Sequence, residues 1–490
     1  MNLSELLKGI TEETVNAKYN FAIEGLVLDS REVKKGFVFI ALSGSKDHGL
    51  YYAEQAIKNG ALAVIYDPQG SEEFQLDELN SPLFRVKELN LKLGFIADRF
   101  YQSPSEKIEV IGITGTNGKT TCSQFLLQLI PKCGVIGTLG WGSTESIKKT
   151  INTTPDALTL QKIMASFVTA QKKTVVMEVS SHGLQQGRVN NINFKGALFT
   201  NLSRDHLDYH ETMEAYLKVK LTLFKQAGLQ YAVVNADDPN SEQFLAVVNN
   251  KTKCWAYSAN GNHLANAENI SAEKVKYSLE GIAFLLCWQQ QKIPVKTSIV
   301  GDFNLENILA VITVLLAQGH DLSDVLKKTS RLTAVPGRME RFGGSNQPTI
   351  FVDYAHTPDA LDKVLKGLKK QCLGKLWLVF GCGGNRDTGK RAEMGTIASN
   401  LADKVIITND NPRFENEEVI FNDIKNGCLN NNYEVIQNRE HAIQTAVTQA
   451  KLRDCVLIAG KGHEDYQDVN GEKLSFSDQN VVKQSLLEWP

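Results

Sequence analysis

The chain has 490 residues, of which 42% are hydrophobic and 22% charged, a balance that excludes intrinsic disorder and fibrous repeats. At about 150 residues per domain, this length predicts roughly three domains. The 53 Lys and Arg against 55 Asp and Glu leave a net charge of −2, so no basic surplus indicates a nucleic-acid or membrane surface.

The sequence predicts neither a targeting signal nor a CxxC cysteine pair. No apolar run approaches the ~20 residues needed to span a bilayer. The N-terminal MNLSELLKGI has no basic region before an apolar core, so we expect no secretory signal. Eight cysteines, none in a CxxC pair, are expected to be reduced and mostly structural. A cytoplasmic, multidomain protein is predicted.

The first predicted domain covers residues 1–105. Short apolar runs at 37–42 and 61–66 and a helical stretch at 53–60 indicate a small α/β unit. The segment YQSPSEK, residues 101–107, has the proline and polar residues of a linker.

The second predicted domain covers residues 106–333. A β-branched strand at 107–114 is followed by a glycine loop and a helix at 119–130, and buried strands are expected at 174–179, 197–202 and 231–235. This alternation favours a largely parallel sheet with helices on both faces. Residues 251–300 are expected to be more antiparallel, and a helix follows at 304–318.

The third predicted domain covers residues 334–490, with strands at 349–354, 375–380, 404–409 and 454–460, each followed by a polar loop and a helix. In open α/β sheets, ligands bind at the carboxyl ends of the strands. The unusual residues of this chain follow those strand ends.

The segment GITGTNGKTT, residues 112–121, joins a strand to a helix. Its glycines let backbone N–H groups face a phosphate at a helix N-terminus, and Lys119 reaches the terminal phosphates. Thr120 is placed to coordinate Mg²⁺. The strict P-loop pattern fails at Ile113, and a plain glycine turn is the alternative, but we predict an ATP site.

Two further strand-end segments contain candidate metal ligands. MEVSSHGL, residues 177–184, contains Glu178, and TNLSRDHLDYH, residues 200–210, contains Asp205 and His206. Mg²⁺ prefers carboxylates, waters and phosphate oxygens, so Glu178 is the better ligand, with a histidine as supplement. Zinc is not expected without a Cys pair or HExxH. Each segment alone is also compatible with a solvated loop.

Ten motifs occur in the order found in the Mur ligases: GTNGKTT, NTTPD, EVSSHGL, DHLDYH, GDFNLEN, PGRMERF, DYAHTPDAL, GGNRD, DNPR and GKGHEDY. Over essentially its whole length the chain resembles this family. The resemblance implies a UDP-binding N-terminal α/β domain, a central P-loop-type ATPase domain and a C-terminal Rossmann-like domain that receives an amino acid.

The resemblance also implies an activity. ATP would drive amide formation between the D-glutamate γ-carboxylate of UDP-N-acetylmuramoyl-L-alanyl-D-glutamate and meso-2,6-diaminopimelate, with Mg²⁺, in a monomeric enzyme of peptidoglycan precursor synthesis. The DNPR motif is the form found in diaminopimelate-adding members. A lysine-adding ligase, a more distant folylpolyglutamate synthetase, and a nucleotide-dependent switch without chemistry are the alternatives.

Site residues follow from the resemblance by position. The catalytic residues would be Lys119, Glu178, His206 and Lys220. The metal ligands would be Thr120, Glu178, His206 and Lys220, the last as a carbamate (N6-carboxylysine). ATP would contact Gly115, Thr116, Asn117, Gly118, Lys119, Thr120, Thr121, Asn304, Arg341, Asp353 and His356. Only its position fifteen residues after Asp205 distinguishes Lys220 from Lys218, which we expect to face solvent.

The two other substrates would bind elsewhere. The UDP-muramoyl dipeptide would contact Leu28, Ser30, Ser45, Lys46, Asp47, Asn152, Thr153, Thr154, Ser180, Gln186 and Arg188. Hydroxyl, amide and guanidinium groups suit such a polar anion, although NTTPD would equally suit a helix N-cap. Diaminopimelate would contact Arg386, Asp410, Asn411, Pro412, Arg413, Gly460 and Glu464. The alternative for GCGGNRD, a dinucleotide loop, fails the GxGxxG pattern at Arg386.

Overall fold

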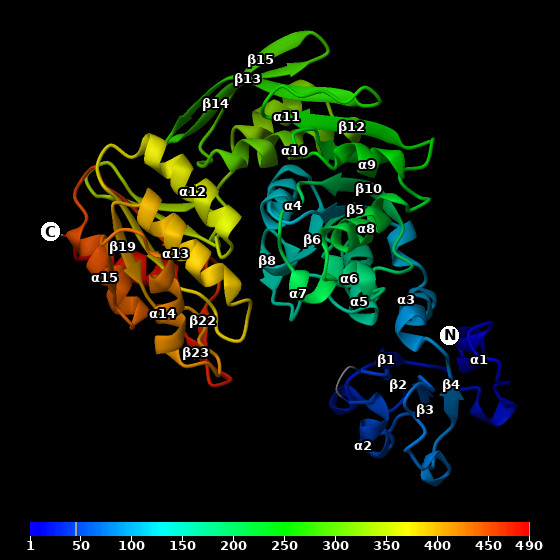
Figure 1. Cartoon of the computed structure of the whole chain (residues 1–490). Helices are drawn as coiled ribbons and strands as arrows, with labels where there is room; N and C mark the ends of the chain where they lie inside the picture. Colours follow the sequence, from blue (N-terminus) through cyan, green and yellow to red (C-terminus); the bar gives the residue numbers. More distant parts are fainter. Residues whose placement is uncertain (45–46, 490) are drawn as a thin grey trace.

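The computed structural model describes residues 1–44 and 47–489. It has three α/β lobes along the chain, each built on its own sheet (Figure 1). The three-domain, mainly parallel α/β architecture expected from the sequence is confirmed. No helix in the described part of the chain is both long and apolar enough to cross a membrane.

The N-terminal lobe contains a four-stranded parallel sheet in the order β1-β2-β3-β4. Its strands are β1 (Gly25–Val27), β2 (Phe37–Ala41), β3 (Ala63–Tyr66) and β4 (Leu83–Arg85). Its α-helices are α1 (Leu3–Leu7), α2 (Ala53–Lys58) and α3 (Leu89–Phe100), and the last leads to the central lobe (Figure 1).

The central lobe contains an eleven-stranded sheet in the order β15-β14-β13-β12-β11-β10-β5-β9-β6-β7-β8. The strands are β5 (Glu109–Thr114), β6 (Cys133–Gly137), β7 (Gly140–Ser143), β8 (Ser146–Lys148), β9 (Thr174–Glu178), β10 (Phe194–Phe199), β11 (Tyr231–Asn235), β12 (Lys253–Ser258), β13 (Glu268–Ser278), β14 (Gly281–Trp288) and β15 (Gln291–Thr297). The α-helices are α4 (Lys119–Leu129), α5 (Ala157–Thr169), α6 (Ser181–Gln185), α7 (Leu207–His210), α8 (Met213–Phe224), α9 (Ser241–Ala246), α10 (Phe303–Ala317) and α11 (Leu322–Thr329).

The directions of the strands in this sheet determine where the candidate site residues lie. β5 pairs in parallel with β9 and β10, so the three carboxyl ends lie together. The expectation of antiparallel structure over 251–300 is wrong for β12, which pairs in parallel with β11 and β13. It holds from β13 to β15, which form antiparallel hairpins. The residues of β12 become more buried along the strand without alternating, and so short a segment carries little pattern that distinguishes parallel from antiparallel pairing.

The C-terminal lobe contains a six-stranded sheet in the order β16-β17-β21-β18-β19-β20, antiparallel only at β16. Its strands, with the β22–β23 hairpin, are β16 (Glu340–Gly343), β17 (Thr349–Asp353), β18 (Leu376–Phe380), β19 (Lys404–Ile407), β20 (Tyr433–Val435), β21 (Cys455–Ala459), β22 (Tyr466–Val469) and β23 (Glu472–Ser475). Its helices are α12 (Pro358–Gln371), α13 (Gly389–Leu401), α14 (Glu417–Gly427), α15 (Arg439–Gln449) and α16 (Asp478–Leu487). The predicted strands β17, β18, β19 and β21 are the buried core strands.

Candidate active site

The phosphate loop lies between β5 and α4, and its shape requires glycine at two positions. Gly115 and Gly118 have φ of +145° and +85°, where side chains are disfavoured. A Cβ on Gly115 would approach Thr200 Oγ1 to 1.9 Å. Asn117 N donates to Asn201 Oδ1 at 2.9 Å, and Thr200 Oγ1 donates to Asn117 O at 2.6 Å. The loop is therefore held against the end of β10, with its backbone at the α4 N-terminus.

Two lysines, Lys119 and the buried Lys220, meet at this loop. Lys119 Nζ donates to Gly115 O and Thr116 O, both at 2.8 Å. Lys220 Nζ, from α8, donates to the same Gly115 O at 2.9 Å, and the residue is 1% exposed. Burial lowers the pKa of Lys119, and burial followed by the nearby Lys119 charge lowers the pKa of Lys220 well below its ordinary value. Lys218 is exposed, so the structure distinguishes the two lysines that look alike in the sequence.

Glu178 presents a fixed, buried carboxylate at the end of β9. Its Oε2 accepts from Thr120 Oγ1 at 2.9 Å and from Thr138 Oγ1 at 3.0 Å, and its Oε1 accepts from Thr138 N at 3.0 Å. A Cβ on Gly137 would come within 2.2 Å of Oε1. Carboxylate and hydroxyl oxygens side by side suit a hard divalent cation. Within residues 1–44 and 47–489, no three His, Cys, Asp or Glu side chains already converge as a metal site.

A histidine cluster covers the same edge. The rings of His182 and His206 lie 4.9 Å apart, and His182 lies 5.5 Å from His210. Burial lowers the pKa of His206 to about 4, against the opposing effect of Asp205. His206 is therefore a neutral imidazole near pH 7, the form that can accept a metal ion.

A cavity of about 100 Å³ lies between the phosphate loop and the C-terminal lobe, narrower than the roughly 300–1,000 Å³ typical of small-molecule sites. The central lobe contributes Asn117, Gly118, Thr121, Asn201, Phe303, Glu306 and Asn307 to its walls; residues 338–364 contribute Arg338, Asp353, Tyr354, Ala355, His356, Ala360, Lys363 and Val364. The predicted nucleotide residues Asp353 and His356 thus face the phosphate loop across this cavity.

Two other predicted nucleotide residues do not line the cavity. Asn304 is buried, donates to Val300 O at 2.6 Å and accepts from Asn307 Nδ2 at 3.0 Å. Arg341 Nη1 donates to Leu279 O at 2.9 Å. Asn304 therefore orients the cavity-lining Asn307, and Arg341 packs on the neighbouring hairpin.

The residues predicted for the muramoyl dipeptide form one hydrogen-bonded group in the central lobe. Thr154 Oγ1 donates to Glu178 O at 2.9 Å and accepts from Ser180 N at 3.0 Å. Arg188 Nη1 donates to Thr154 O at 2.7 Å and also contacts Gln186. Thr153 Oγ1 lies 3.0 Å from Thr138 Oγ1, and Asn152 is exposed beside it. The helix cap considered for NTTPD is made by its last residue, Asp156, which accepts from Thr159 N.

The residues predicted for the uridine diphosphate lie in the N-terminal lobe, after β1 and β2. Ser30 is buried, with Oγ donating to Gln55 Oε1 at 2.7 Å. Leu28 is half-buried and Asp47 exposed. Ser45 and Lys46 lie outside the described residues.

The residues predicted for the amino acid gather at the carboxyl ends of β18, β19 and β21. Asn411 Nδ2 donates to Glu464 Oε2 at 2.8 Å. Asp410 lies against Gly460, where a Cβ would approach Asp410 Oδ2 to 2.7 Å. Arg413 has φ of +54°, and its Nη1 donates to Gly384 O at 2.8 Å. Pro412 is buried and Arg386 is exposed beside them.

Three family models match the chain in order: "Mur ligase family, catalytic domain" over residues 22–101, "Mur ligase middle domain" over 113–315, and "Mur ligase, glutamate ligase domain" over 337–462. A UDP-N-acetylmuramoyl-L-alanyl-D-glutamate--2,6-diaminopimelate ligase of Alkalilimnicola ehrlichii is 41% identical over 476 residues, 95% of each chain. The chain belongs to the Mur ligase family.

Two further relatives carry the same name. The Coxiella burnetii ligase is 42% identical over 469 residues, covering 95% of this chain and 96% of its own. A solved structure of a ligase with that name is 36% identical, with a TM-score of 0.69, and the match covers 100% of this chain and 99% of that one. The similarity therefore extends over all three lobes of this Mur ligase.

Sequence reasoning missed two cations of the Mur ligase site. Arg338, in PGRMERF, donates from Nη2 to Thr120 Oγ1 at 3.3 Å and lies 4.3 Å from the Tyr354 ring centre. Lys461, in GKGHEDY, is fully buried and donates to Asn411 Oδ1 and Glu464 Oε2, both at 2.9 Å. Both occur inside motifs that the sequence displays, but their burial depends on contacts between distant segments.

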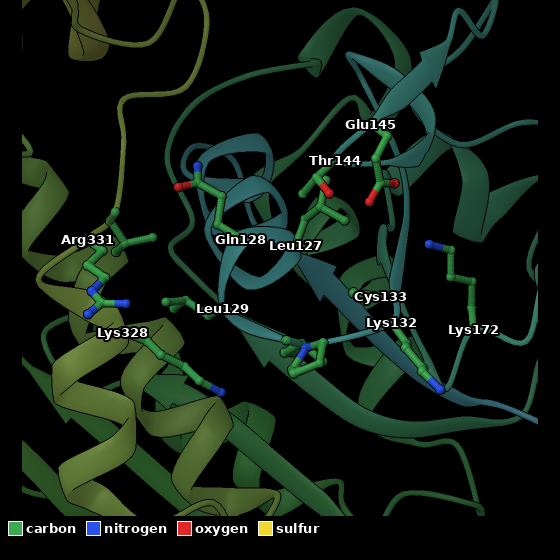
Figure 2. Close-up of a pocket in the computed structure, with 13 residues that line it drawn as sticks. Leu127, Gln128, Leu129, Lys132, Cys133, Thr144, Glu145, Lys172, Lys328 and Arg331 are labelled. Carbon is green, nitrogen blue, oxygen red and sulfur yellow. The ribbon is translucent and has the colours of Figure 1, made fainter.

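A second hollow in this Mur ligase lies at the other end of α4. Figure 2 shows it lined by Lys132, Lys172, Lys328 and Arg331, with Glu145 as the acidic residue. α4 has 11 residues, so about 16 Å of helix separates this hollow from the phosphate loop. It contains none of the predicted site residues, whereas the cavity at the α4 N-terminus contains several of them.

Proposed function

We propose that the chain is an ATP-dependent ligase that joins meso-2,6-diaminopimelate to the D-glutamate γ-carboxylate of UDP-N-acetylmuramoyl-L-alanyl-D-glutamate. One observation carries the proposal. Arg386, Asn411 and Arg413 lie close together on the lobe whose Asp353 and His356 line the cavity facing the phosphate loop, and they bring two guanidinium groups and an amide to one place. Relatives at about 41% identity bear the name of this activity.

The chemistry requires an activated acyl group. The γ-carboxylate oxygen attacks the γ-phosphorus of ATP, the bond to the bridging oxygen breaks, and ADP leaves. Lys119 at the helix N-terminus and Arg338 are placed to neutralise the phosphates as charge moves. The diaminopimelate amine then attacks the acyl carbon, loses a proton and expels phosphate.

Mg²⁺ is part of the proposal. Thr120 and Glu178 would hold it, with His206 and a carbamate on Lys220 as further ligands, because these are oxygen donors or a neutral imidazole at the phosphate loop. When bound, the ion supplies positive charge for the phosphate oxygens. The lowered pKa of Lys220 favours the uncharged amine, which is the form that combines with CO₂.

We further propose domain boundaries at 1–105, 106–333 and 334–490. Leu28, Ser30 and Asp47 would hold the uridine diphosphate, while Thr154, Ser180 and Arg188 would hold the muramoyl peptide. A cytoplasmic location is supported by the free state of all eight cysteines, each within the described residues. The monomeric state remains a prediction.

Phosphate release measured with ATP and the acceptor, with meso-diaminopimelate or L-lysine in parallel, tests the function. Release that depends on both acceptor and diaminopimelate supports the proposal. Equal release with lysine identifies a lysine-adding ligase. Release independent of acceptor and amino acid contradicts ligation.

A further inference from the structure

Two loops form the wall that carries the arginines of the amino-acid pocket. The first loop, residues 381–388, follows β18, and the second loop, residues 408–416, follows β19. Gly384 N donates to Asn411 O at 3.0 Å, and Phe414 N donates to Asn385 Oδ1 at 3.1 Å. The two loops are therefore hydrogen-bonded to each other.

Each loop contains a residue with a left-handed backbone conformation, which asparagine adopts readily and arginine does not. Asn385 has φ of +50° and Arg413 has φ of +54°. Few residues other than glycine adopt the left-handed region, and arginine is not among those that favour it. Such conformations persist only where surrounding contacts hold them. The backbone at Arg413 is therefore strained, whereas Asn385 turns the first loop directly before Arg386 in a conformation that suits asparagine.

The contact that links both loops is an ion pair between Arg391 and Glu415. Arg391, near the start of α13, has a fully buried side chain. Its Nη1 donates to Glu415 Oε1 at 2.7 Å and its Nη2 to Glu415 Oε2 at 2.8 Å. Nη2 also lies 3.3 Å from Gly383 O in the first loop, while Nη1 reaches Asp423 Oδ2 of α14 at 2.9 Å.

Glu415 also binds the first loop directly. Its Oε2 accepts from Asn385 N at 2.8 Å while it also accepts from Arg391. Hydrogen bonds from Arg391 lower the pKa of Glu415 to about 2, so the carboxylate stays ionised at working pH. One carboxylate thus binds the left-handed Asn385 of the first loop and lies two residues from the strained Arg413 of the second.

We propose that Arg391 and Glu415 are positioning residues for the amino-acid substrate, because their ion pair fixes the two loops that present Arg386 and Arg413. The inference rests on the proposed function, in which those two arginines meet substrate carboxylates. The pair acts through the loops and touches neither the phosphate loop nor the nucleotide cavity.

The test compares Glu415→Gln with Asp423→Asn. Both variants remove one negative charge from the same guanidinium, but only Glu415 also accepts from the first loop. An amide oxygen cannot replace two carboxylate oxygens, so Asn385 N or Arg391 loses its partner. A misplacement of about 1 Å costs up to ~10²-fold. We therefore expect the amino-acid KM of Glu415→Gln to rise ~10- to 100-fold, with the ATP KM unchanged.

Asp423→Asn should keep both KM values while losing similar thermal stability, which separates positioning from general destabilisation. An unchanged amino-acid KM in Glu415→Gln, or an equal rise in Asp423→Asn, overturns the inference. If Glu415→Gln does not fold, Arg391→Lys takes its place, because it keeps the charge and loses the two-pronged contact. If the wild type uses an amino acid other than diaminopimelate, the proposed function fails, and the same variants are measured with that amino acid.

Discussion

Replacing Arg413 by alanine tests the specificity assigned to the amino-acid pocket. Diaminopimelate differs from lysine by a second α-amino acid centre, and its additional carboxylate needs a charged partner. In the described part of the chain, Arg413 Nη1 donates to Gly384 O at 2.8 Å, and Arg413 Nε lies 3.9 Å from Asp468 Oδ2. Nη2 has no hydrogen-bond partner there, and it is the group left for a substrate.

The expected rise in the diaminopimelate KM follows from the loss of the one contact made by Nη2. A hydrogen bond to a charged group contributes ~1.5–3 kcal/mol, and 1.4 kcal/mol is a tenfold change in equilibrium. Loss of the Nη2 contact therefore raises the diaminopimelate KM ~10- to 150-fold. The effect should fall on KM more than on kcat, because this end of the substrate is remote from the reacting amine.

Steady-state phosphate release with both amino acids measures these effects. In the wild type, lysine should be poorer by ~10⁴–10⁵, since it leaves the arginine unpaired. Arg413→Lys, which keeps the charge without the planar fork, should lie between wild type and alanine. Equal efficiency with lysine in the wild type, or an unchanged diaminopimelate KM in Arg413→Ala, would refute the reasoning.

Other substitutions address the phosphate loop and acid stability. Lys119→Ala should lower turnover ~10²–10³-fold at saturating ATP, and near wild-type phosphate release would contradict the ATP site. Lys220→Ala should be nearly inactive and partly rescued by a short carboxylic acid. Replacing the exposed Lys218 by alanine should have a mild effect. Intact-mass evidence of an unmodified Lys220 in active enzyme would argue against the carbamate. Burial lowers the pKa of His463 to about 3, so the unfolded imidazole binds a proton first and native stability should fall as pH drops from about 6.5 toward 3. Thermal unfolding between pH 7.5 and 4.5 should show a shallower loss for His463→Asn, and identical slopes would remove His463 as a source.

Most of the fold could be predicted because its core strands are continuous apolar runs. β5, β9, β17 and β18 are buried along almost their whole length, and such runs indicate parallel strands covered on both faces. β16 and β20 were not predicted. Both are short edge strands with partly exposed residues, and half-exposed segments of three or four residues carry little periodicity.

The residues of the candidate site also differ in how well the sequence alone predicts them. Lys119, Glu178 and Asp353 follow strong strands, so parallel pairing alone brings them to one edge of each sheet. Lys220 could be chosen over Lys218 only by resemblance, because helical spacing does not say which side of α8 is covered. The role of Asn307 in the cavity, with Asn304 behind it, depends on which face of α10 meets the phosphate loop. Such choices are set by tertiary packing rather than by local sequence.

Both the central and the C-terminal lobe line the proposed nucleotide cavity, and this has a thermodynamic consequence. Its walls come from Asn117 and Asn307 on one side and from Asp353 and His356 on the other, so a nucleotide that touches both sides is fully bound only while the lobes stay together. Nucleotide affinity and the angle between the lobes are then thermodynamically coupled. A change in either one changes the other by the same coupling free energy. If ADP occupies this cavity as proposed, its release would be coupled to separation of the lobes, and such an opening step limits turnover in many enzymes.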